Sequence, residues 1–379
     1  MSGPRSWWSP RGVPLGPRLI AFDRIRFGIT IAGIGFAVVL LLFLIALYDG
    51  VRTESNGYIA SRPVHAWVAQ DNTTNFIKSS SFLMAAGADV LSEVDGVIEV
   101  TPLLRLITTV HFGDRHATAI ILGFAPQSVA GRPEMAEGSA VPGRGEIVLD
   151  RALASQLGVR INGTLTVHGR AVRVVGLSRG TNSVMTQLAF IPLDDARELF
   201  GVPQVASFLL VRGAPEVSHD ALVERLAGRV PRTSVFTREQ FAANNMQELE
   251  GGFLPILATV AMLGGIVALA ILTLLLYGAI LEQRETYAVL KAIGAPDSVL
   301  TRLILFQSLA AVVGGMVFGV AAYALCAPLV LWAVPVMALS LSPSALAAVG
   351  VAFAIIGMVG ALLPLRRVQR IHPAELFRA

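Results

Sequence analysis

The chain has 379 residues, of which 54% are hydrophobic and only 15% charged, and this balance excludes an ordinary soluble protein of that length. The net charge of +4 comes from basic residues that are spread along the chain and flank apolar runs, which indicates a membrane protein with no nucleic-acid partner. The single cysteine, Cys326, lies in an apolar run, so one chain cannot build a disulfide framework or a thiolate metal site.

The N-terminal part predicts a cytosolic tail followed by the first membrane span. Residues 1–17 are rich in Pro, Gly, Ser and Arg, and Arg18–Arg26 has the spacing of a short interfacial helix, so residues 1–26 are expected to form a cytosolic tail and this helix. Residues 27–48 carry no charge and are long enough, at about 1.5 Å per residue, to cross a hydrocarbon core of about 30 Å. A cleaved signal peptide is the alternative, but the run is long for one and is followed by a poor cleavage site.

Residues 49–250 predict a mixed α/β domain between the first and second spans. Apolar and polar residues alternate on both sides of His168-Gly169, which is typical of a β-hairpin, and Gly113-Asp114 marks a second turn of this kind. Thr237 followed by Gln240 fits a capping box, and this box would open a helix that leads towards the next span.

Two further uncharged runs predict three more spans. The second of these runs is about three times the length of one span, and three prolines interrupt it near its middle. The expected segments are a second span at 251–281, a cytosolic segment at 282–302, a third span at 303–327, a short outer loop at 328–343, a fourth span at 344–365 and a cytosolic tail at 366–379.

The basic residues also predict the orientation of the chain. They gather in both terminal tails and in segment 282–302, whereas the loop near Pro335 has none. The positive-inside rule then places both termini and this segment in the cytosol and the large domain outside. The expected fold is an α-helical membrane protein with four transmembrane helices and a mixed α/β extracytoplasmic domain inserted between helices 1 and 2.

The sequence carries no P-loop for ATP binding by this chain and no H-E-x-x-H motif for zinc-dependent catalysis. The four spans contain no Asp, Glu, Lys or Arg, which argues against a secondary transporter with an intramembrane ion relay. His111 and His116 would face each other across a hairpin. Without a third ligand we interpret them as two half-exposed strand histidines and predict no metal site.

The charged segment 282–302 predicts a helix, a break and a second helix. Glu285–Ile293 can form about two turns, Gly294 fits a left-handed C-cap, and Pro296 stops the helix. Asp297 can then cap the helix that enters the third span. On spacing alone, an ordinary solvated loop is an equal alternative.

The stretch RETYAVLKAIGA at Arg284–Ala295 resembles the coupling segment of MacB/FtsX-type (type VII) ABC transporter permeases. The stretch LLPLRRVQRIHPAELF resembles the closing signature of that family, and GEIVLDRALASQLGVRINGTLTVHGRAVRVVGL resembles its extracytoplasmic core domain. The resemblance covers nearly the whole chain from Arg18 onward. Gln307 is a departure, because many members have a Glu early in the third span.

This resemblance implies a permease subunit that is not an enzyme and that works as a homodimer in the cell membrane with a separate cytosolic ABC ATPase. ATP and Mg would bind to that partner, and this chain is expected to bind no cofactor. Membrane lipids are implied as neighbours, and an extracytoplasmic adaptor stays an open question. The residues to which the resemblance assigns coupling to the ATPase are Arg284, Glu285, Leu290, Lys291, Gly294 and Ala295.

Within the family, the length and the first span look most like DevC-type permeases of glycolipid exporters, with heme-exporter permeases a near second. The implied function is export of a lipid-like or amphipathic substrate, whether glycolipid, lipid or heme. Tyr48, Met246 and Met262 are candidate substrate contacts, although we prefer packing as their role. The alternative function is FtsX-like regulation of an extracellular cell-wall hydrolase without transport.

Overall fold

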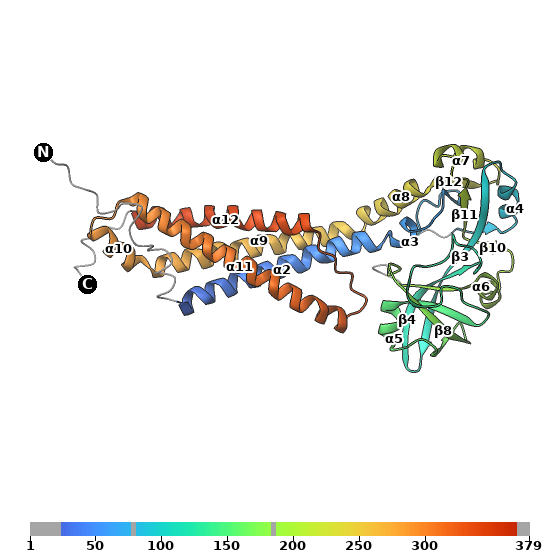
Figure 1. Ribbon diagram of the computed structural model, residues 1–379, viewed down its shortest axis with the longest axis horizontal. Coiled ribbons are helices and arrows are strands. Elements are labelled where there is room, and N and C mark those ends of the chain that lie inside the picture. Colours follow the sequence, from blue (N-terminus) through green and yellow to red (C-terminus); the bar gives the residue numbers. More distant parts are fainter. Residues whose placement is uncertain (1–23, 77–80, 183–186, 370–379) are drawn as a thin grey trace. The chain divides into compact units, whose positions relative to one another are not determined.

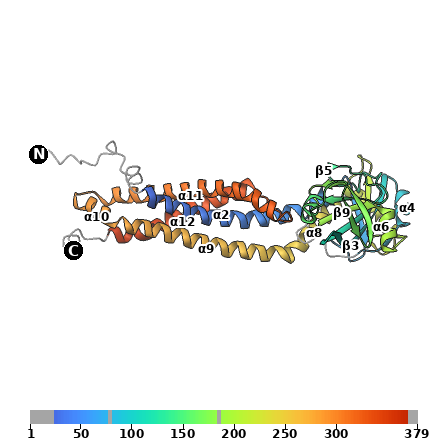
Figure 2. The same ribbon diagram turned by 90° about the horizontal axis from the view of Figure 1, so that it is seen from below.

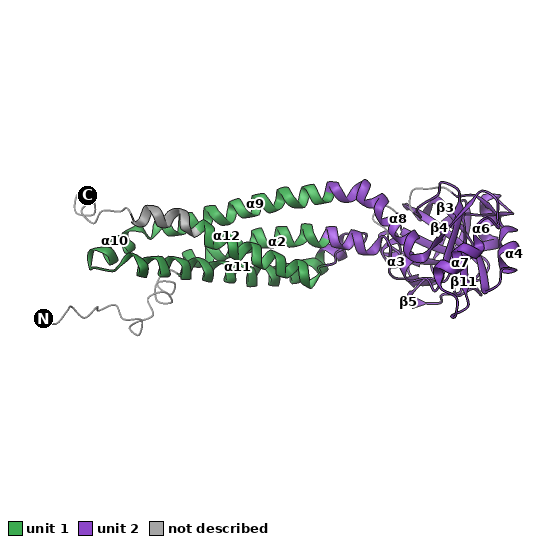
Figure 3. Cartoon of the chain, turned by 90° about the horizontal axis from the view of Figure 1, so that it is seen from above, with its two compact units in different colours: residues 1–46, 257–329, 341–379 green, residues 47–256, 330–340 purple. Residues whose placement is uncertain are grey.

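The computed structural model describes residues 24–76, 81–182 and 187–369, with side chains described as far as residue 360. The chain divides into two compact units, which Figure 3 colours separately. Unit 1 consists of residues 1–46, 257–329 and 341–379, and unit 2 consists of residues 47–256 and 330–340. The expected N-terminal tail and the part of the expected interfacial helix before Arg24 lie outside the described residues. The part of the C-terminal signature after residue 369 also lies outside them.

Four long helices supply the membrane-spanning part of the chain. Within the described ranges these four are long and apolar enough to cross a bilayer, and they run side by side in Figures 1 and 2. Their bounds are α2 Arg24–Glu54, α9 Phe253–Glu282, α11 Asp297–Ala333 and α12 Pro343–Gln369. They share one apolar core, to which α2 gives Leu42, α9 gives Leu272, α11 gives Val312 and α12 gives Phe353. This arrangement confirms the expected four-span fold.

The ends of these helices differ in places from the sequence expectation. The third spanning helix passes through Pro328 and ends at Ala333, whereas we expected it to end at Ala327. A proline removes only one helical N–H group, and the apolar residues after it continue the helix. Pro343 is the first residue of α12, a position where its missing N–H is not needed. Arg24–Arg26, expected in a separate interfacial helix, form the first turn of α2.

Unit 2 is built around one large sheet with the strand order β12-β1-β11-β3-β4-β9-β6-β8-β5, while β7 pairs with both β3 and β8. The long strand β3 pairs with β11 through its first half and with β4 through its second half. A small second sheet contains β2 and β10. The strand bounds are β1 Ala66–Gln70, β2 Leu83–Met84, β3 Val97–Phe112, β4 Arg115–Phe124, β5 Met135–Gly138, β6 Glu146–Asp150, β7 Thr164–Val167, β8 Arg170–Ser178, β9 Gln187–Pro192, β10 Val205–Ala206, β11 Phe208–Gly213 and β12 Thr233–Thr237.

Both predicted hairpins are present in unit 2. Strands β7 and β8 are joined by His168-Gly169, and both residues have positive φ, which is the backbone of a two-residue type I′ turn. Gly113-Asp114 joins β3 and β4, and Gly113 has a φ of 58°. His111 and His116 pair across this hairpin, with their ring centroids 5.9 Å apart.

Helices cover this sheet because its strands alternate their side chains between the two faces. On β1, Trp67 packs with Phe241 of α8, and the two rings stack at 4.8 Å. The next residue, Val68, packs with Leu222 of α7 in a separate core. The expected capping box of Thr237 and Gln240 opens α8. The helix bounds are α3 Gly57–Ala60, α4 Gly87–Ser92, α5 Arg151–Leu157, α6 Leu193–Phe200, α7 His219–Leu226 and α8 Arg238–Gly251.

Candidate functional site

The segment expected to couple to an ATPase forms a separate helix, α10 Arg284–Ala292, between α9 and α11. It ends in a left-handed turn at Gly294, whose φ is 95°. The Gly294 N–H donates to the Lys291 carbonyl at 3.0 Å, and the Ala295 N–H donates to the Leu290 carbonyl at 3.0 Å. This pair of bonds is a Schellman motif, and it satisfies carbonyl groups that the end of the helix would otherwise leave unpaired.

Helix α10 has one buried and one exposed face. Tyr287 and Ala288 are 1% and 3% exposed, and Leu290 packs with them against the start of α11. On the other face, Arg284 and Glu285 are exposed together with Val289 and Ile293, which are 55% and 65% exposed. The exposed face therefore combines an opposite-charge pair with aliphatic side chains, a mixture that suits contact with another protein.

A buried hydrogen-bond chain anchors α10. The Tyr287 hydroxyl lies 2.7 Å from Oε1 of Gln307 on α11 and 2.9 Å from Oε1 of Gln283. The hydroxyl has one proton for two acceptors, and the buried Nε2 of Gln307 has no partner within the described residues. Turning the Gln307 amide lets its NH₂ group donate to Tyr287, which then donates to Gln283. Burial raises the pKa of Tyr287 above its usual range, so the phenol keeps its proton.

Two ion pairs lie near the ends of these helices. Lys291 Nζ is 3.6 Å from Asp297 Oδ1 across the glycine turn, and Arg26 Nε is 3.1 Å from Glu282 Oε2. We expected Asp297 to cap α11, but the Pro296 carbonyl already accepts from the N–H group of Leu300. Asp297 is therefore the first residue inside the helix. There its negative charge interacts favourably with the helix dipole.

The three candidate substrate contacts are divided between the two units. Tyr48 and Met246 are half-buried residues of unit 2, and Met262 is a 60% exposed residue of unit 1. Across the described residues, no group of three or more His, Cys, Asp or Glu side chains is placed to hold a metal ion.

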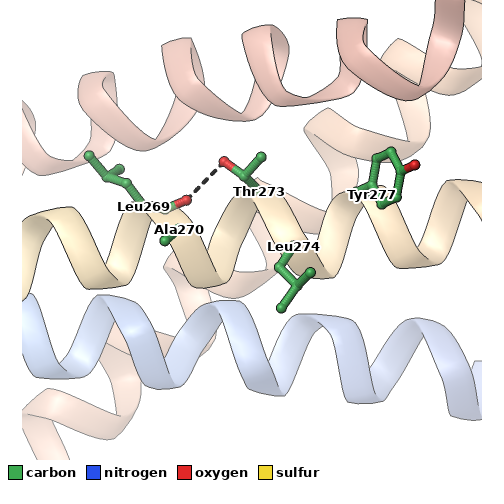
Figure 4. A pocket seen from close by; sticks show the side chains of 5 residues that line it. All are labelled: Leu269, Ala270, Thr273, Leu274 and Tyr277. Atoms are coloured by element: carbon green, nitrogen blue, oxygen red, sulfur yellow. Dashed lines mark hydrogen bonds between the residues drawn. The ribbon is translucent and has the colours of Figure 1, made fainter.

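Unit 1 has an open apolar depression along α9 that was not predicted from the sequence. It has a volume of about 480 Å³ and is lined by residues of α9, namely Leu269, Ala270, Thr273, Leu274 and Tyr277 (Figure 4). The Thr273 hydroxyl donates to the Leu269 carbonyl at 2.9 Å, so its polar group is satisfied within its own helix. The remaining surface is mainly aliphatic and suits an acyl chain. All five lining residues lie on α9, and the depression is open to its surroundings.

Two family models match the chain. The model of the MacB-like periplasmic core domain matches residues 27–229, and the model of the FtsX-like permease C-terminal matches residues 258–373. The first match covers more than half of the chain and runs from α2 to the end of α7, so β12 lies outside it. The second contains α10 and the last two spans.

Two sequence relatives match the chain over most of its length, and one solved structure resembles part of it. An uncharacterized ABC transporter permease of Mycobacterium bovis is 26% identical over 361 residues, which is 95% of this chain and 97% of the relative. The lipoprotein-releasing system transmembrane protein LolC of Neisseria meningitidis is 24% identical and is covered over 76% of its length, against 77% of this chain. The crystal structure of the periplasmic region of MacB from Actinobacillus actinomycetemcomitans is 16% identical, with a TM-score of 0.38, over 50% of this chain and 94% of that one.

Proposed function

Because the chain belongs to the MacB/FtsX-type family of ABC transporter permeases, we propose that it couples ATP hydrolysis by a cytosolic partner to export of a lipid-like or amphipathic substrate. Permeases of this family work with an ATPase, and this chain lacks a nucleotide-binding motif of its own. The name of the LolC relative, a lipoprotein-releasing protein, supports a lipid-bearing substrate. The narrower likeness to DevC-type exporters stays a prediction.

The two-faced helix α10 is the observation that carries this proposal. Its exposed face offers Arg284, Glu285 and two aliphatic residues to a partner. Its buried face is fixed by Tyr287, so a push on the exposed face cannot be absorbed by local sliding of the helix. An ordinary solvated loop would not bury an aromatic side chain and tie its hydroxyl to the next span.

The proposed mechanism transmits motion through rigid helices. Closure of the ATPase would press on α10, and α10 is held between the end of α9 and the start of α11. At its N-terminal end, α9 follows α8, a helix of unit 2, and only Gly252 lies between the two helices. Motion of α10 would thus reach unit 2 through α9 and α8. The spans carry no charged residues in their apolar runs, which fits a substrate taken from lipid rather than from a polar pore.

The rest of the proposed assembly follows the positive-inside rule and the family. Both termini and α10 lie in the cytosol, unit 2 lies outside, and two copies of the chain form a homodimer with two ATPase subunits.

The test is ATP hydrolysis by the permease and its ATPase, co-purified in lipid nanodiscs. We expect Arg284→Ala/Glu285→Ala to lower the hydrolysis rate several-fold, because it removes the charged part of the exposed face. Hemin and a membrane-lipid extract are added separately, and the additive that stimulates hydrolysis identifies the substrate class. Arg160→Ala/Glu137→Ala is the matched control, since it removes one exposed charge of each sign from unit 2.

Equal rates for both double variants would contradict the coupling role of α10. Loss of the complex on a size-exclusion column, with the control complex intact, would show instead that the same face is needed for assembly, which also supports the docking role. Recovery of a bound extracellular hydrolase, with no stimulation by hemin or lipid, would favour the regulatory function over transport.

A further inference from the structure

The segment that follows α11 packs with unit 2, although the helices on both sides of it belong mainly to unit 1. Residues 330–340 are assigned to unit 2, whereas α11 before residue 330 and the whole of α12 are assigned to unit 1 (Figure 3). We call residues 334–340 the strap. A turn closed by the Met337 N–H and the Val334 carbonyl, at 3.1 Å, begins the strap directly after α11. Little free chain therefore separates the strap from the end of the helix.

The strap touches the end of α2 through its backbone. Ala338 is only 5% exposed, and a Cβ atom at position 50 would overlap its carbonyl group. Gly50 lies within α2, where its backbone is helical, so the position requires a glycine for close approach and not for an unusual φ. Any side chain at position 50 would have to push the strap away from α2.

The strap is also attached to the large sheet of unit 2. The Asn182 side chain donates to the Val336 carbonyl of the strap at 3.0 Å. Asn182 itself forms an isolated bridge with Gln187, the first residue of β9. The strap is therefore held from two directions, by the end of α2 and by the chain that leads into β9.

Buried hydrogen bonds fix the end of α2 to α8. The side chain of Asn245, which is fully buried on α8, donates to Asn56 Oδ1 at 2.7 Å and to the Ser55 carbonyl at 3.3 Å. Asn56 donates in return to the Ala242 carbonyl of α8 at 2.8 Å. These contacts resist sliding, because breaking them leaves buried polar groups without partners. The strap, the end of α2 and α8 thus form one connected set of contacts within unit 2.

At its other end, α11 is attached to the coupling helix. The Tyr287 hydroxyl of α10 lies 2.7 Å from Oε1 of Gln307 on α11. From there α11 continues through Pro328 to Ala333. Its 37 residues make a rod of about 55 Å. The coupling helix and the strap are therefore attached near opposite ends of one continuous helix.

We propose that the strap is a second connection through which motion of α10 reaches unit 2, by way of α11 and the end of α2. It acts beside the path through α9 and α8, and the two paths meet where Asn56 contacts Asn245. Lifting the strap from Gly50 would leave only the first path. This inference rests on the coupling role of α10 proposed above.

The test is hydrogen exchange, followed by mass spectrometry, of the full permease with its ATPase in lipid nanodiscs. Exchange is compared without nucleotide and with ATP plus vanadate, which traps the ATPase. In the wild type we expect nucleotide to change exchange of α10, the strap and residues 50–57 at least about twofold. Gly50→Ala should speed exchange of the strap without nucleotide and reduce the nucleotide response of residues 50–57 by at least about half, while α10 still responds.

Two further variants make the result specific. Gly28→Ala is the matched control, because Gly28 also lies in α2 but has open space where a Cβ would be placed, and it should behave as the wild type does. Asn182→Ala loosens the strap without changing α2, and it should also speed exchange of the strap and weaken the response of residues 50–57. It keeps the test decisive if Gly50→Ala does not assemble with the ATPase on a size-exclusion column.

The outcomes separate this inference from the proposed function. A wild-type response at α10 with none at the strap would overturn the strap alone. So would a looser strap with an undiminished response at residues 50–57, or unchanged exchange of the strap in both strap variants. The absence of any nucleotide response at α10 would overturn the coupling role of that helix and the strap together.

Discussion

The hydroxyl of Tyr287 lies 2.7 Å from the side-chain amide of Gln307, and both residues are at least nine-tenths buried. This contact joins α10 to the third spanning helix at a place where the neighbouring side chains are apolar. A hydrogen bond in such surroundings fixes the position of a helix, because breaking it leaves two buried polar groups without partners.

Tyr287→Phe should therefore destabilise the permease by about 1–3 kcal/mol, because it strands the Gln307 amide. Tyr287→Phe/Gln307→Leu should recover most of that loss, since both polar partners are then replaced by apolar groups. Thermal unfolding of the purified chain measures the stability, and ATP hydrolysis with the partner measures coupling. A double variant that is as unstable as Tyr287→Phe would show that packing, and not the hydrogen bond, positions α10.

Gly294→Val should uncouple ATP hydrolysis from transport. The space around Gly294 is open, so the only obstacle to a side chain is its φ of 95°, which β-branched residues strongly resist. The strain is of order 1–2 kcal/mol and would unwind the Schellman turn that orients α10.

Gly278→Val provides the control for this change. Gly278 also has open space around it, but it lies within α9 and has no positive φ. Hydrolysis and substrate transport are compared in proteoliposomes for both variants. Transport by Gly294→Val at the rate of Gly278→Val would show that the turn is not needed for coupling.

Phe241→Ala should lower the free energy of unfolding of unit 2 by about 3–5 kcal/mol, the usual loss for a buried aromatic side chain. Phe241 is fully buried and stacks on Trp67, so its removal leaves a cavity in the core that joins α8 to the sheet. Phe241→Leu fills part of that space and should lose less. Chemical denaturation of the full chain, followed by tryptophan fluorescence, measures both. Equal stability of Phe241→Ala and wild type would show that this core collapses around the change.

The ion pair of Glu239 should make unit 2 less stable in acid. Burial opposes ionisation of Glu239, but its hydrogen bonds to His219 and Arg238 outweigh burial and lower its pKa to about 2. Because the folded pKa lies below the unfolded value of about 4.5, the contribution is complete above that pH and is lost as pH falls towards 2.

The comparison of wild type with Glu239→Gln tests this pH dependence. The difference between their unfolding midpoints should be constant from pH 6 to pH 5 and should shrink as the pH is lowered to 3. The groups that face Glu239 are His219, Arg238 and, through His219, His65. A midpoint difference that does not change down to pH 3 would assign the effect to packing.

The four spans and the inserted domain could be read from the sequence, because both are local properties. The length of an uncharged run must match the thickness of a bilayer, so residues 27–48 and 251–281 identify spans without knowledge of their neighbours. The turns at His168-Gly169 and Gly294 were equally predictable, since the backbone there needs residues that tolerate positive φ. The end of the third spanning helix at Ala333, beyond Pro328, was not predicted, because one proline inside an apolar helix costs less than the remaining turns gain.

Only the tertiary structure decided which residues work together. A family resemblance assigned Arg284 and Glu285 to a coupling segment, whereas the contact of Tyr287 with Gln307 joins positions twenty residues apart on different helices. The strap brings positions 50, 182 and 338 together, which no local pattern connects. The sequence by itself determined the elements, because hydropathy and turn geometry act between neighbours along the chain. Packing between distant segments decided the sites, because burial and pairing depend on the whole fold.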